Sequence, residues 1–423
     1  MSRSSPSLLT ITFAWGLHAL AALLWLTTIL SVLGWLIGRI WTDETLITQY
    51  LYWVPTLMRL VGGAAALALA WALRSCARRL LRRPTPAAGV SGTRRGRAIG
   101  LYRVAAIGLV VMLAHFVFIE WRMFARGPQP RLGGDGVNSW RLSYWNVSGA
   151  ERGAWVQNVL AAEPDLVIIA NLWGYKSFLE FRDAFKGAKG PTPSVFFDPR
   201  FMVATRWPLV RWGATDLRLP QSEEAKKLGQ DRFFRTDPGR AAFLELDVSE
   251  CDALRSLGRP LVVWIIDLPS DISLHRPRVT RNAADAIATL GAAPMEYREG
   301  QWFATGNRVP FPAPDVIVGD FNIPRGSSSL ANLAGGARDA YDIAGSGYAA
   351  TFPSGRDEVL GVLARDPARA SWFKQALAAL LGRPWWKLDH AFVSSPCEVT
   401  GYRVLDPGSG THRLQMLDIR TPR

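Results

Sequence analysis

The sequence has few of the residues that build disulfide frameworks or zinc sites. Its 423 residues include five histidines and three cysteines, Cys76, Cys251 and Cys397, and the cysteines do not have the spacing of a zinc site. Cys251 and Cys397 could pair in an oxidising compartment, and the sequence leaves that pairing open. The chain also lacks internal repeats and heptads, which excludes solenoids and coiled coils.

Acidic residues are nearly missing from the first third of the chain. Residues 1–126 hold 14 arginines and 3 acids, a net charge of +11, whereas the other residues hold 35 basic and 32 acidic side chains, a net charge of +3. A nucleic-acid-binding protein normally concentrates positive charge on its soluble domain. The positive charge therefore belongs to the first third, and the remainder has no strong nucleic-acid footprint.

Three long apolar runs lie in this arginine-rich part. Residues 11–38 contain no charged side chain, residues 51–73 contain only Arg59, and residues 101–119 contain Arg103. As helices, such runs span a hydrocarbon core of roughly 30 Å. Buried core helices are the alternative, and a cleaved signal peptide fits the first run poorly because its apolar stretch is too long. The sequence predicts a membrane anchor of three transmembrane helices within residues 1–126.

The charge of the connecting segments predicts the orientation of the anchor. Short loops rich in arginine stay in the cytoplasm. We therefore expect a multi-pass protein of the cytoplasmic membrane, with everything after the third run outside the cytoplasm. The segment between the second and third runs carries eight arginines and no acid: Arg74, Arg78, Arg79, Arg82, Arg83, Arg94, Arg95 and Arg97.

Strand and helix patterns alternate in the rest of the chain. Residues 127–137 are rich in proline and glycine and are expected to form a linker. Short apolar strands such as 165–170 then alternate with amphipathic helices such as 278–290. A further amphipathic pattern, 368–381, either packs on the core or lies on a membrane surface. So many strands with interspersed helices predict an α/β sandwich over residues 138–423.

Polar side chains recur at the ends of the predicted strands. Asn146 ends a strand in "LSYWNVSG", and "VGDFN" places Asp320 and Asn322 on either side of a phenylalanine. Asp389 begins a strand in "WWKLDHAFVSS", and His412 precedes the last strand in "GSGTHRLQ". Each of these residues alone could be a turn residue, a helix cap or a solvated loop residue. Strand alternation predicts that Asp320 and Asn322 face the same side.

Taken in this order, the motifs resemble those of the endonuclease/exonuclease/phosphatase family. "GDFN" is the most specific of them, and "ATRWPLV" (204–210) and "YAATFPSG" (348–355) resemble weaker family segments. The resemblance covers residues 137–421, and it implies a deoxyribonuclease I-like fold, a four-layered α/β sandwich. It also implies hydrolysis of a phosphate ester with a divalent cation, Mg²⁺ or Mn²⁺.

The resemblance implies a role for each polar residue. Asp320 would activate or position the attacking water, Asn322 would hold the phosphate, and Asn146 would orient Asp320. Asp389 would pair with His412, fixing its tautomer and keeping it charged beside the phosphate. These roles agree with the chemistry, because phosphoryl transfer requires positioning and charge neutralisation more than covalent catalysis.

The part of the motif set that holds the metal departs from the family. Asn171 stands where the family has its main metal-binding glutamate, Asp267 stands in place of a histidine, and Thr411 in place of an aspartate. Mg²⁺ prefers charged oxygen ligands. We therefore expect a weakened metal site in which Asp267, together with Asn171, substitutes for the lost carboxylates.

Three functions follow from these observations. The first is a membrane-anchored phosphoesterase acting on a lipid headgroup or a small phosphate ester rather than on DNA, because an anchored enzyme meets headgroups at high local concentration. The second is a catalytically impaired relative that serves as a binding or scaffolding ectodomain. The third, a transporter or sensor, is disfavoured because Arg59 and Arg103 lie near enough to the span ends to reach the interface. The sequence does not indicate the oligomeric state.

Overall fold

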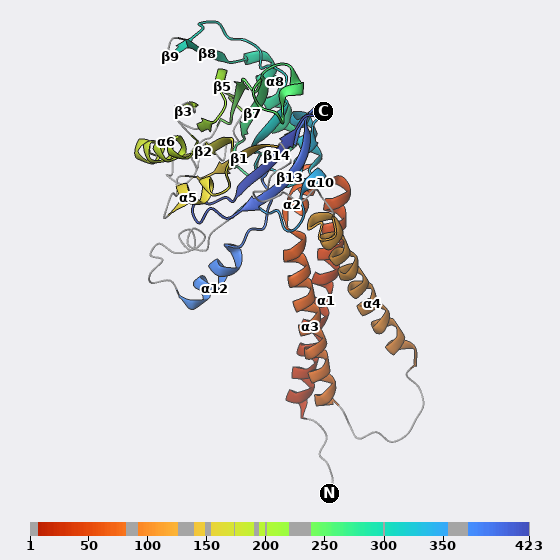
Figure 1. Cartoon of the computed structure of the whole chain (residues 1–423). Coiled ribbons are helices and arrows are strands. Elements are labelled where there is room, and N and C mark those ends of the chain that lie inside the picture. The colour runs from red at the N-terminus through yellow and green to blue at the C-terminus, as the bar shows by residue number, and fades with distance from the viewer. Residues whose placement is uncertain are drawn as a thin grey trace. The chain divides into compact units, whose positions relative to one another are not determined.

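The protein, a computed structural model, divides into two compact units, residues 1–121 and residues 122–423 (Figure 1). The linker predicted at 127–137 lies outside the described part of the chain. The structure describes residues 7–81, 92–125, 139–148, 154–172, 174–189, 194–198, 201–219, 238–298, 301–353 and 371–422.

The first unit is entirely helical in its described part. Three of its helices, Leu8–Trp41, Thr56–Leu81 and Tyr102–Glu120, are long enough and apolar enough to cross a membrane. This supports the predicted membrane association. The elements are α1 (Leu8–Trp41), α2 (Leu46–Trp53), α3 (Thr56–Leu81), α4 (Gly92–His115) and the single π-turn η1 (Phe116–Glu120).

The second candidate membrane helix begins later than the sequence predicts. Residues 51–53 belong to the short helix α2, and Val54 is extended with φ −69° and ψ 113°. A proline disfavours helical geometry in the residue before it, so Pro55 ends α2 and lets α3 start at Thr56. The apolar run from residue 51 to residue 73 is therefore divided between α2 and α3.

The Arg59 side chain lies between helices of the first unit. Only 9% of its surface is exposed, and its guanidinium donates to the backbone oxygens of Ser31 (3.0 Å) and Leu51 (2.7 Å). Gly34 leaves the space, because a Cβ there would lie 3.2 Å from Nη1 of Arg59. An arginine inside a helix bundle is tolerated when backbone oxygens satisfy it, so Arg59 joins α1, α2 and α3.

The second unit is built around two mixed sheets. Within the described residues, one sheet has six strands in the order β13-β14-β1-β2-β4-β3, and the other has eight in the order β11-β12-β10-β7-β6-β5-β8-β9. In each sheet one pair is parallel, β1 with β2 and β7 with β10. The strands are β1 (Trp140–Asn146), β2 (Leu166–Ala170), β3 (Ser194–Asp198), β4 (Phe201–Thr205), β5 (Leu209–Asp216), β6 (Arg240–Leu246), β7 (Leu261–Asp267), β8 (Ala293–Arg298), β9 (Gln301–Ala304), β10 (Val316–Asp320), β11 (Arg338–Asp339), β12 (Asp389–Val393), β13 (Glu398–Leu405) and β14 (Leu414–Arg420).

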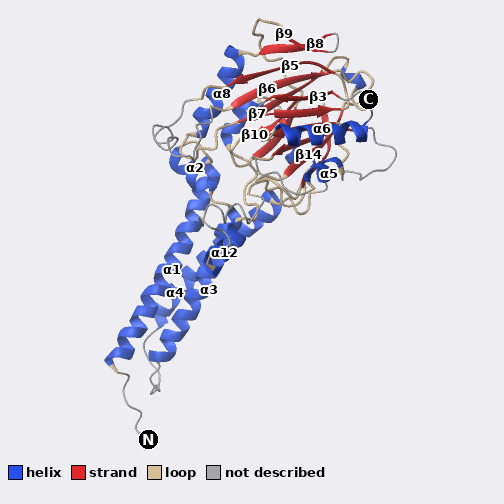
Figure 2. Ribbon diagram, turned by 90° about the vertical axis from the view of Figure 1, so that its left-hand side faces the viewer, coloured by secondary structure: helices blue, strands red, loops and turns tan. Residues whose placement is uncertain are grey.

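Helices lie beside the strands of this unit (Figure 2). The buried apolar side chains of its described part form three clusters. One cluster contains side chains of both sheets, including Tyr144 and Val318. A second joins α8 to the eight-stranded sheet, and a third joins α5 and α6 to the six-stranded sheet. The mixed α/β class predicted from the sequence is confirmed. The helices are α5 (Trp155–Leu160), α6 (Tyr175–Lys189), η2 (Arg255–Leu257), α8 (Arg276–Leu290), η3 (Ser328–Leu330), α9 (Ala331–Ala334), α10 (Ala340–Ala344) and α12 (Trp372–Leu381).

The cysteines form no disulfide. Cys251 and Cys397 are both buried free thiols, and Cys76 is exposed. Burial raises the pKa of the Cys397 thiol to about 12 and also raises that of Cys251. Both thiols are therefore protonated at neutral pH and behave as small apolar core residues.

Candidate active site

The predicted polar residues come from strand ends that meet at one place. Asn146, Asp267 and Asp320 are the last residues of β1, β7 and β10. Asn171 follows β2, and Asp389 begins β12, which runs antiparallel to β10. The carboxyl ends of parallel strands lie on the same edge of a sheet, and the two sheets present these edges to each other at the site.

The register of the eight-stranded sheet places three carboxylates side by side. Asp320 is directly opposite Asp389 on one neighbouring strand and Asp267 on the other. Gly319 permits this close packing, because a Cβ there would lie 1.8 Å from the backbone oxygen of Ile266. The close approach of β7 therefore requires the glycine of the "GDFN" motif. The side chain of the next residue, Asp320, enters the site.

His412 and Asp389 form a buried pair. Nδ1 of His412 lies 2.8 Å from Oδ2 of Asp389, and both side chains are almost fully buried. The backbone oxygen of His412 accepts a hydrogen bond from Nε1 of Trp145 at 2.8 Å, and the ring of Phe352 lies 4.8 Å from its ring. Burial lowers the pKa of His412, but the negative charges of Asp389 and Asp320 outweigh it and raise the pKa to about 9. The imidazole is therefore charged at neutral pH, as the resemblance implies.

Asp320 is held in one orientation by three neighbours. Oδ2 accepts a hydrogen bond from Nδ2 of Asn146 at 2.8 Å, and Oδ1 accepts one from the backbone N–H of Asn322 at 2.9 Å. Nε2 of His412 lies 3.7 Å from Oδ2. Burial raises the pKa of Asp320 to about 6, although the positive charge of His412 lowers it in part. The predicted orienting contact between Asn146 and Asp320 is therefore present.

A hydrogen-bonded chain continues from Asp320 to the opposite side of the site. Oδ1 of Asn146 accepts from the backbone of Ser148 (3.1 Å) and from Nδ2 of Asn171 (3.1 Å). The same Asn171 nitrogen donates to Oδ2 of Asp267 at 3.3 Å. Two acceptors fix the orientation of the Asn171 amide, because both need the NH₂ group. Asn171 therefore links Asn146 to Asp267 through its nitrogen.

Asn322 differs from the geometry that strand alternation suggested. Strand β10 ends at Asp320, and Asn322 has a left-handed backbone with φ +50°, which asparagine tolerates better than most residues. Its Nδ2 donates to the backbone oxygen of Leu268 at 2.7 Å. The alternation argument was wrong for this pair because the strand has already ended. Phe321 between them is fully buried, as expected.

A divalent cation fits the carboxylate side of the site. Among the described residues, Asp320, Asp389 and His412 are the group whose ligand atoms lie together, all within 4.8 Å of one another. Oδ1 of Asp389 is buried and has no hydrogen-bond partner in the part of the chain that the structure describes. Carboxylate oxygens suit Mg²⁺ and Mn²⁺. The assignment of Asn171 and Asp267 as metal ligands stays a prediction.

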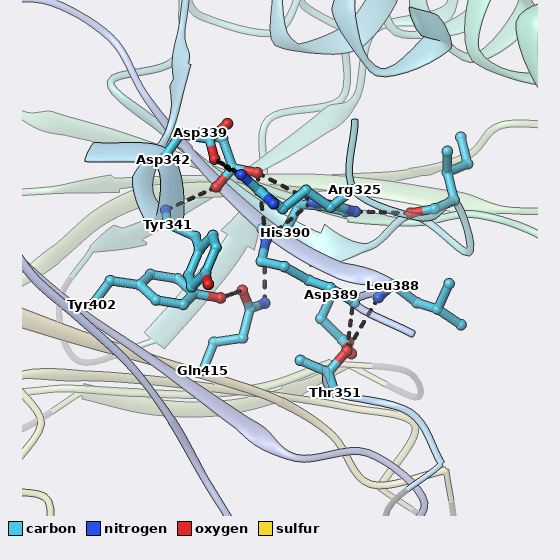
Figure 3. Close-up of polar contacts among 12 residues, drawn as sticks. Arg325, Asp339, Tyr341, Asp342, Thr351, Leu388, Asp389, His390, Tyr402 and Gln415 are labelled. Carbon is cyan, nitrogen blue, oxygen red and sulfur yellow. Dashed lines mark hydrogen bonds and ion pairs between the residues drawn. The ribbon is translucent and has the colours of Figure 1, made fainter. Parts of the chain in front are cut away.

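Two features behind the site were not found from the sequence. Oγ1 of Thr351 accepts hydrogen bonds from the backbone N–H groups of Leu388 (3.2 Å) and Asp389 (3.3 Å) and so fixes the start of β12 (Figure 3). Thr351 belongs to the weak "YAATFPSG" resemblance, which was the only signal for it. The second feature is a buried charged cluster next to it.

The charged cluster consists of Asp339, Lys387 and His390 (Figure 3 labels Asp339 and His390). Nζ of Lys387 lies 3.1 Å from Nδ1 of His390 and 3.4 Å from Oδ2 of Asp339. Nε2 of His390 lies 2.8 Å from the backbone oxygen of Ile323. Burial raises the pKa of Asp339, but Lys387 and His390 outweigh it and hold the pKa far below its usual range. Burial lowers the pKa of His390 and of Lys387.

Comparison with known proteins finds similar solved structures. No protein-family model matches the chain, and no curated protein matches it. An endonuclease/exonuclease/phosphatase family protein from Bacteroides thetaiotaomicron shares 14% identity over 67% of this chain and 95% of its own, with a TM-score of 0.40. A mannosyl-6-phosphatase of the same organism shares 15% identity over 66% and 99%, with a TM-score of 0.38. A family protein from Beutenbergia cavernae shares 13% identity over 67% and 72%, with a TM-score of 0.38.

Proposed function

We propose that the protein is a membrane-anchored phosphoesterase that hydrolyses a phosphate ester by attack of water. The observation that carries the proposal is the buried arrangement in which Asn146 holds Asp320 and Asp389 holds a charged His412. A core packed for stability alone rarely buries carboxylates and a charged imidazole together, because each one loses hydration. Shifted pKa values of buried groups in one place are typical of catalytic sites.

Asp320 is the residue that orients and activates water. Its pKa of about 6 leaves it ionised at neutral pH and still basic enough to accept a proton from water in the transition state. Asn146 and the backbone of Asn322 each bind one of its oxygens, so the carboxylate has a fixed direction. Fixed orientation lowers the entropy cost of the reaction.

His412 supplies the positive charge that a phosphate needs. Asp389 binds Nδ1 of His412, which leaves Nε2 directed toward Asp320 and available to a phosphate oxygen or to the leaving group. One charged imidazole faces three neighbouring carboxylates, so the protein alone leaves the site negative. Asp320 and Asp389 would hold a divalent cation, which would neutralise the charge that develops on the phosphate oxygens.

The membrane anchor favours a lipid headgroup, or a small ester near the bilayer, as the substrate. Three helices of this chain are suited to cross a membrane, and tethering raises the local concentration of headgroups. The charge of the soluble part, near balance at +3, lacks the excess that nucleic-acid binders carry. We place the protein in the cytoplasmic membrane with the catalytic unit outside, as the arginine-rich loop suggests.

A binding or scaffolding role is the second candidate, and Asn171 favours it. The amide nitrogen of Asn171 donates to both Asn146 and Asp267. Residue 171 therefore presents hydrogen-bond donors to the site rather than a charged oxygen ligand. A site altered in this way could retain phosphate binding without turnover.

Hydrolysis of bis(p-nitrophenyl) phosphate by the purified full chain in detergent separates the two functions. The wild type should turn over with Mg²⁺, Mn²⁺ or Ca²⁺, and Asp320→Asn should lower kcat/KM by about 10²–10⁴. Asp285→Asn on the exposed side of α8 is the matched control and should retain full activity. Wild-type turnover no greater than that of Asp320→Asn in every metal would overturn the enzyme proposal.

A further inference from the structure

The helix α12, Trp372–Leu381, has its apolar side turned outward. Trp372 is 79% exposed, Phe373 61% and Leu380 51%, whereas Ala378 is fully buried. The apolar residues Trp372, Phe373 and Leu380 fall within an arc of roughly 100°, because each residue turns the helix by about that angle. Figure 1 shows α12 standing apart from the strands of its own unit.

The helix α8 of the same unit shows the usual arrangement. It buries Val279, Ala283 and Ile287 against the eight-stranded sheet and exposes Arg281 and Asp285. In α12 the small alanine faces the protein and the large aromatic residues face outward. Soluble proteins rarely expose such residues together, and a contiguous apolar patch marks an interaction surface.

The charge around α12 indicates what the surface contacts. Residues 367–388 contain no aspartate or glutamate. Their basic residues outside the buried charged cluster are Arg369, Lys374 and Arg383, whereas Lys387 is buried against Asp339. Lys374 lies on the exposed helix itself. An amphipathic helix with aromatic residues on one side and only basic charges beside it is suited to the interface of a bilayer that contains anionic lipid.

We propose that the exposed side of α12 inserts into the surface of the lipid bilayer that holds the chain. The bilayer is favoured over other occupants because the same chain carries three helices suited to cross a membrane, so lipid is always at high local concentration. Trp is enriched at the boundary between headgroups and acyl chains, and Trp, Phe and Leu form the buried side of interfacial helices.

This contact also places the candidate active site beside headgroups, an extension that rests on the proposed function. Nε1 of Trp385 donates to the backbone oxygen of Leu380 at 3.2 Å, at the end of α12. The backbone N–H groups of Trp385 and Trp386 each lie 2.9 Å from the backbone oxygen of Phe352, whose ring touches His412. The helix is therefore linked to the catalytic histidine through one short segment, and it directs the enzyme to esters in the lipid layer.

Fluorescence quenching tests the insertion without reference to activity. The full chain is reconstituted in nanodiscs of phosphatidylcholine and phosphatidylglycerol, with and without bromine on the acyl chains near the headgroup. The emission of Trp372 is obtained as the difference between the wild type and Trp372→Phe. This emission should be quenched by brominated lipid and protected from acrylamide in the water. Trp71→Phe, within the apolar helix α3, is the positive control.

Two results would overturn the insertion. Emission of Trp372 that is quenched by acrylamide and unaffected by bromine would place the helix in water. Emission protected from both, together with two chains in each nanodisc, would show that a second copy covers it.

A substrate comparison tests the extension. The double variant Trp372→Ser/Phe373→Ser should lower hydrolysis of a phosphate ester embedded in the nanodisc by about tenfold. The double variant should leave hydrolysis of soluble bis(p-nitrophenyl) phosphate unchanged. The control variant Phe303→Ser, at an exposed apolar residue on β9, should leave this hydrolysis unchanged as well. An equal loss on both esters would contradict the extension. Wild type inactive on both esters would refute the proposed function, while the quenching result would still decide the insertion.

Discussion

Nδ2 of Asn171 lies 3.3 Å from Oδ2 of Asp267, so an amide hydrogen bond joins two strand ends at the site. The resemblance implies a metal-binding glutamate at the Asn171 position. The local backbone also suits asparagine, since Asn171 has φ +56°. This contact therefore holds the geometry by hydrogen bonds where an acidic residue would hold it through a shared cation.

Replacing Asn171 by an acid should strengthen cation binding. Asn171→Asp has nearly the same shape but places a further carboxylate beside Asp267, and this excess negative charge attracts Mn²⁺. Calorimetric titration of the full chain in detergent should show Mn²⁺ affinity higher by about tenfold or more than in the wild type. Asn158→Asp, an asparagine of α5 away from the carboxylates, is the control. Equal affinity of all three proteins would show that residue 171 does not face the cation.

Activity should depend on pH in a bell shape. Asp320 must be ionised to accept a proton, so the rate rises as pH increases through its pKa of about 6. His412 must be charged, so the rate falls as pH increases through its pKa of about 9. Rates of bis(p-nitrophenyl) phosphate hydrolysis from pH 5 to pH 10 should give a maximum between these two values. Asp389→Asn should lower the upper limit, because the charge that raises the pKa of His412 is removed. A rate still rising at pH 10 would exclude a charged His412 as the acid.

Lys387→Met should destabilise the second unit. Lys387 and Asp339 are 5% and 9% exposed, so the substitution leaves a buried carboxylate with less compensation. Breaking a buried ion pair costs about 3–5 kcal/mol. The melting temperature of the full chain in detergent should therefore fall by roughly 6–15 °C. Arg255→Met removes the ion pair with Asp252, whose members are 67% and 58% exposed. It should change the melting temperature by no more than a few tenths of the shift expected for Lys387→Met. Equal shifts in the two variants would contradict this account of the cluster.

The orientation can be measured with fusions. Alkaline phosphatase folds only outside the cytoplasm, so a fusion after Arg423 should be active and one within residues 82–91 should be inactive. The opposite pattern would reverse the proposed orientation and would place the candidate site on the cytoplasmic side. A green fluorescent protein at the same two positions is the complementary control, since it should fluoresce only inside.

The sequence was sufficient where the physical signal is local. β-branched runs such as Val316–Val318 predict buried strands, and strand β10 lies there. Strand β5, Leu209–Asp216, has a weaker local signal, because its residues are mostly half-exposed or exposed and include Gly213. The break between α2 and α3 at Val54–Pro55 also has a local signal, the proline. This proline lies within an apolar run, and the whole run was predicted to form one span.

The candidate site shows the same division. The order of polar strand ends indicated Asn146, Asp320, Asp389 and His412, and the structure brings these four together. The cluster around Lys387 was not predicted, because Asp339 lies 48 residues earlier in the chain and each member alone resembles a surface charge. The direction of the Asn171 amide also depends on contacts that no local pattern encodes.

Neighbouring side chains of β12 point to opposite faces, so this strand contributes both to the candidate site and to the charged cluster of Asp339, Lys387 and His390. Asp389 contacts His412 while the next residue, His390, contacts Asp339 and Lys387 on the other side of the strand. A shift of β12 by one residue would exchange these two side chains, because neighbours on a strand point to opposite faces. The shifted pairing would place an imidazole against Asp320 and an unpaired carboxylate beside Asp339. The register of β12 therefore decides which of the two side chains, Asp389 or His390, faces the candidate site.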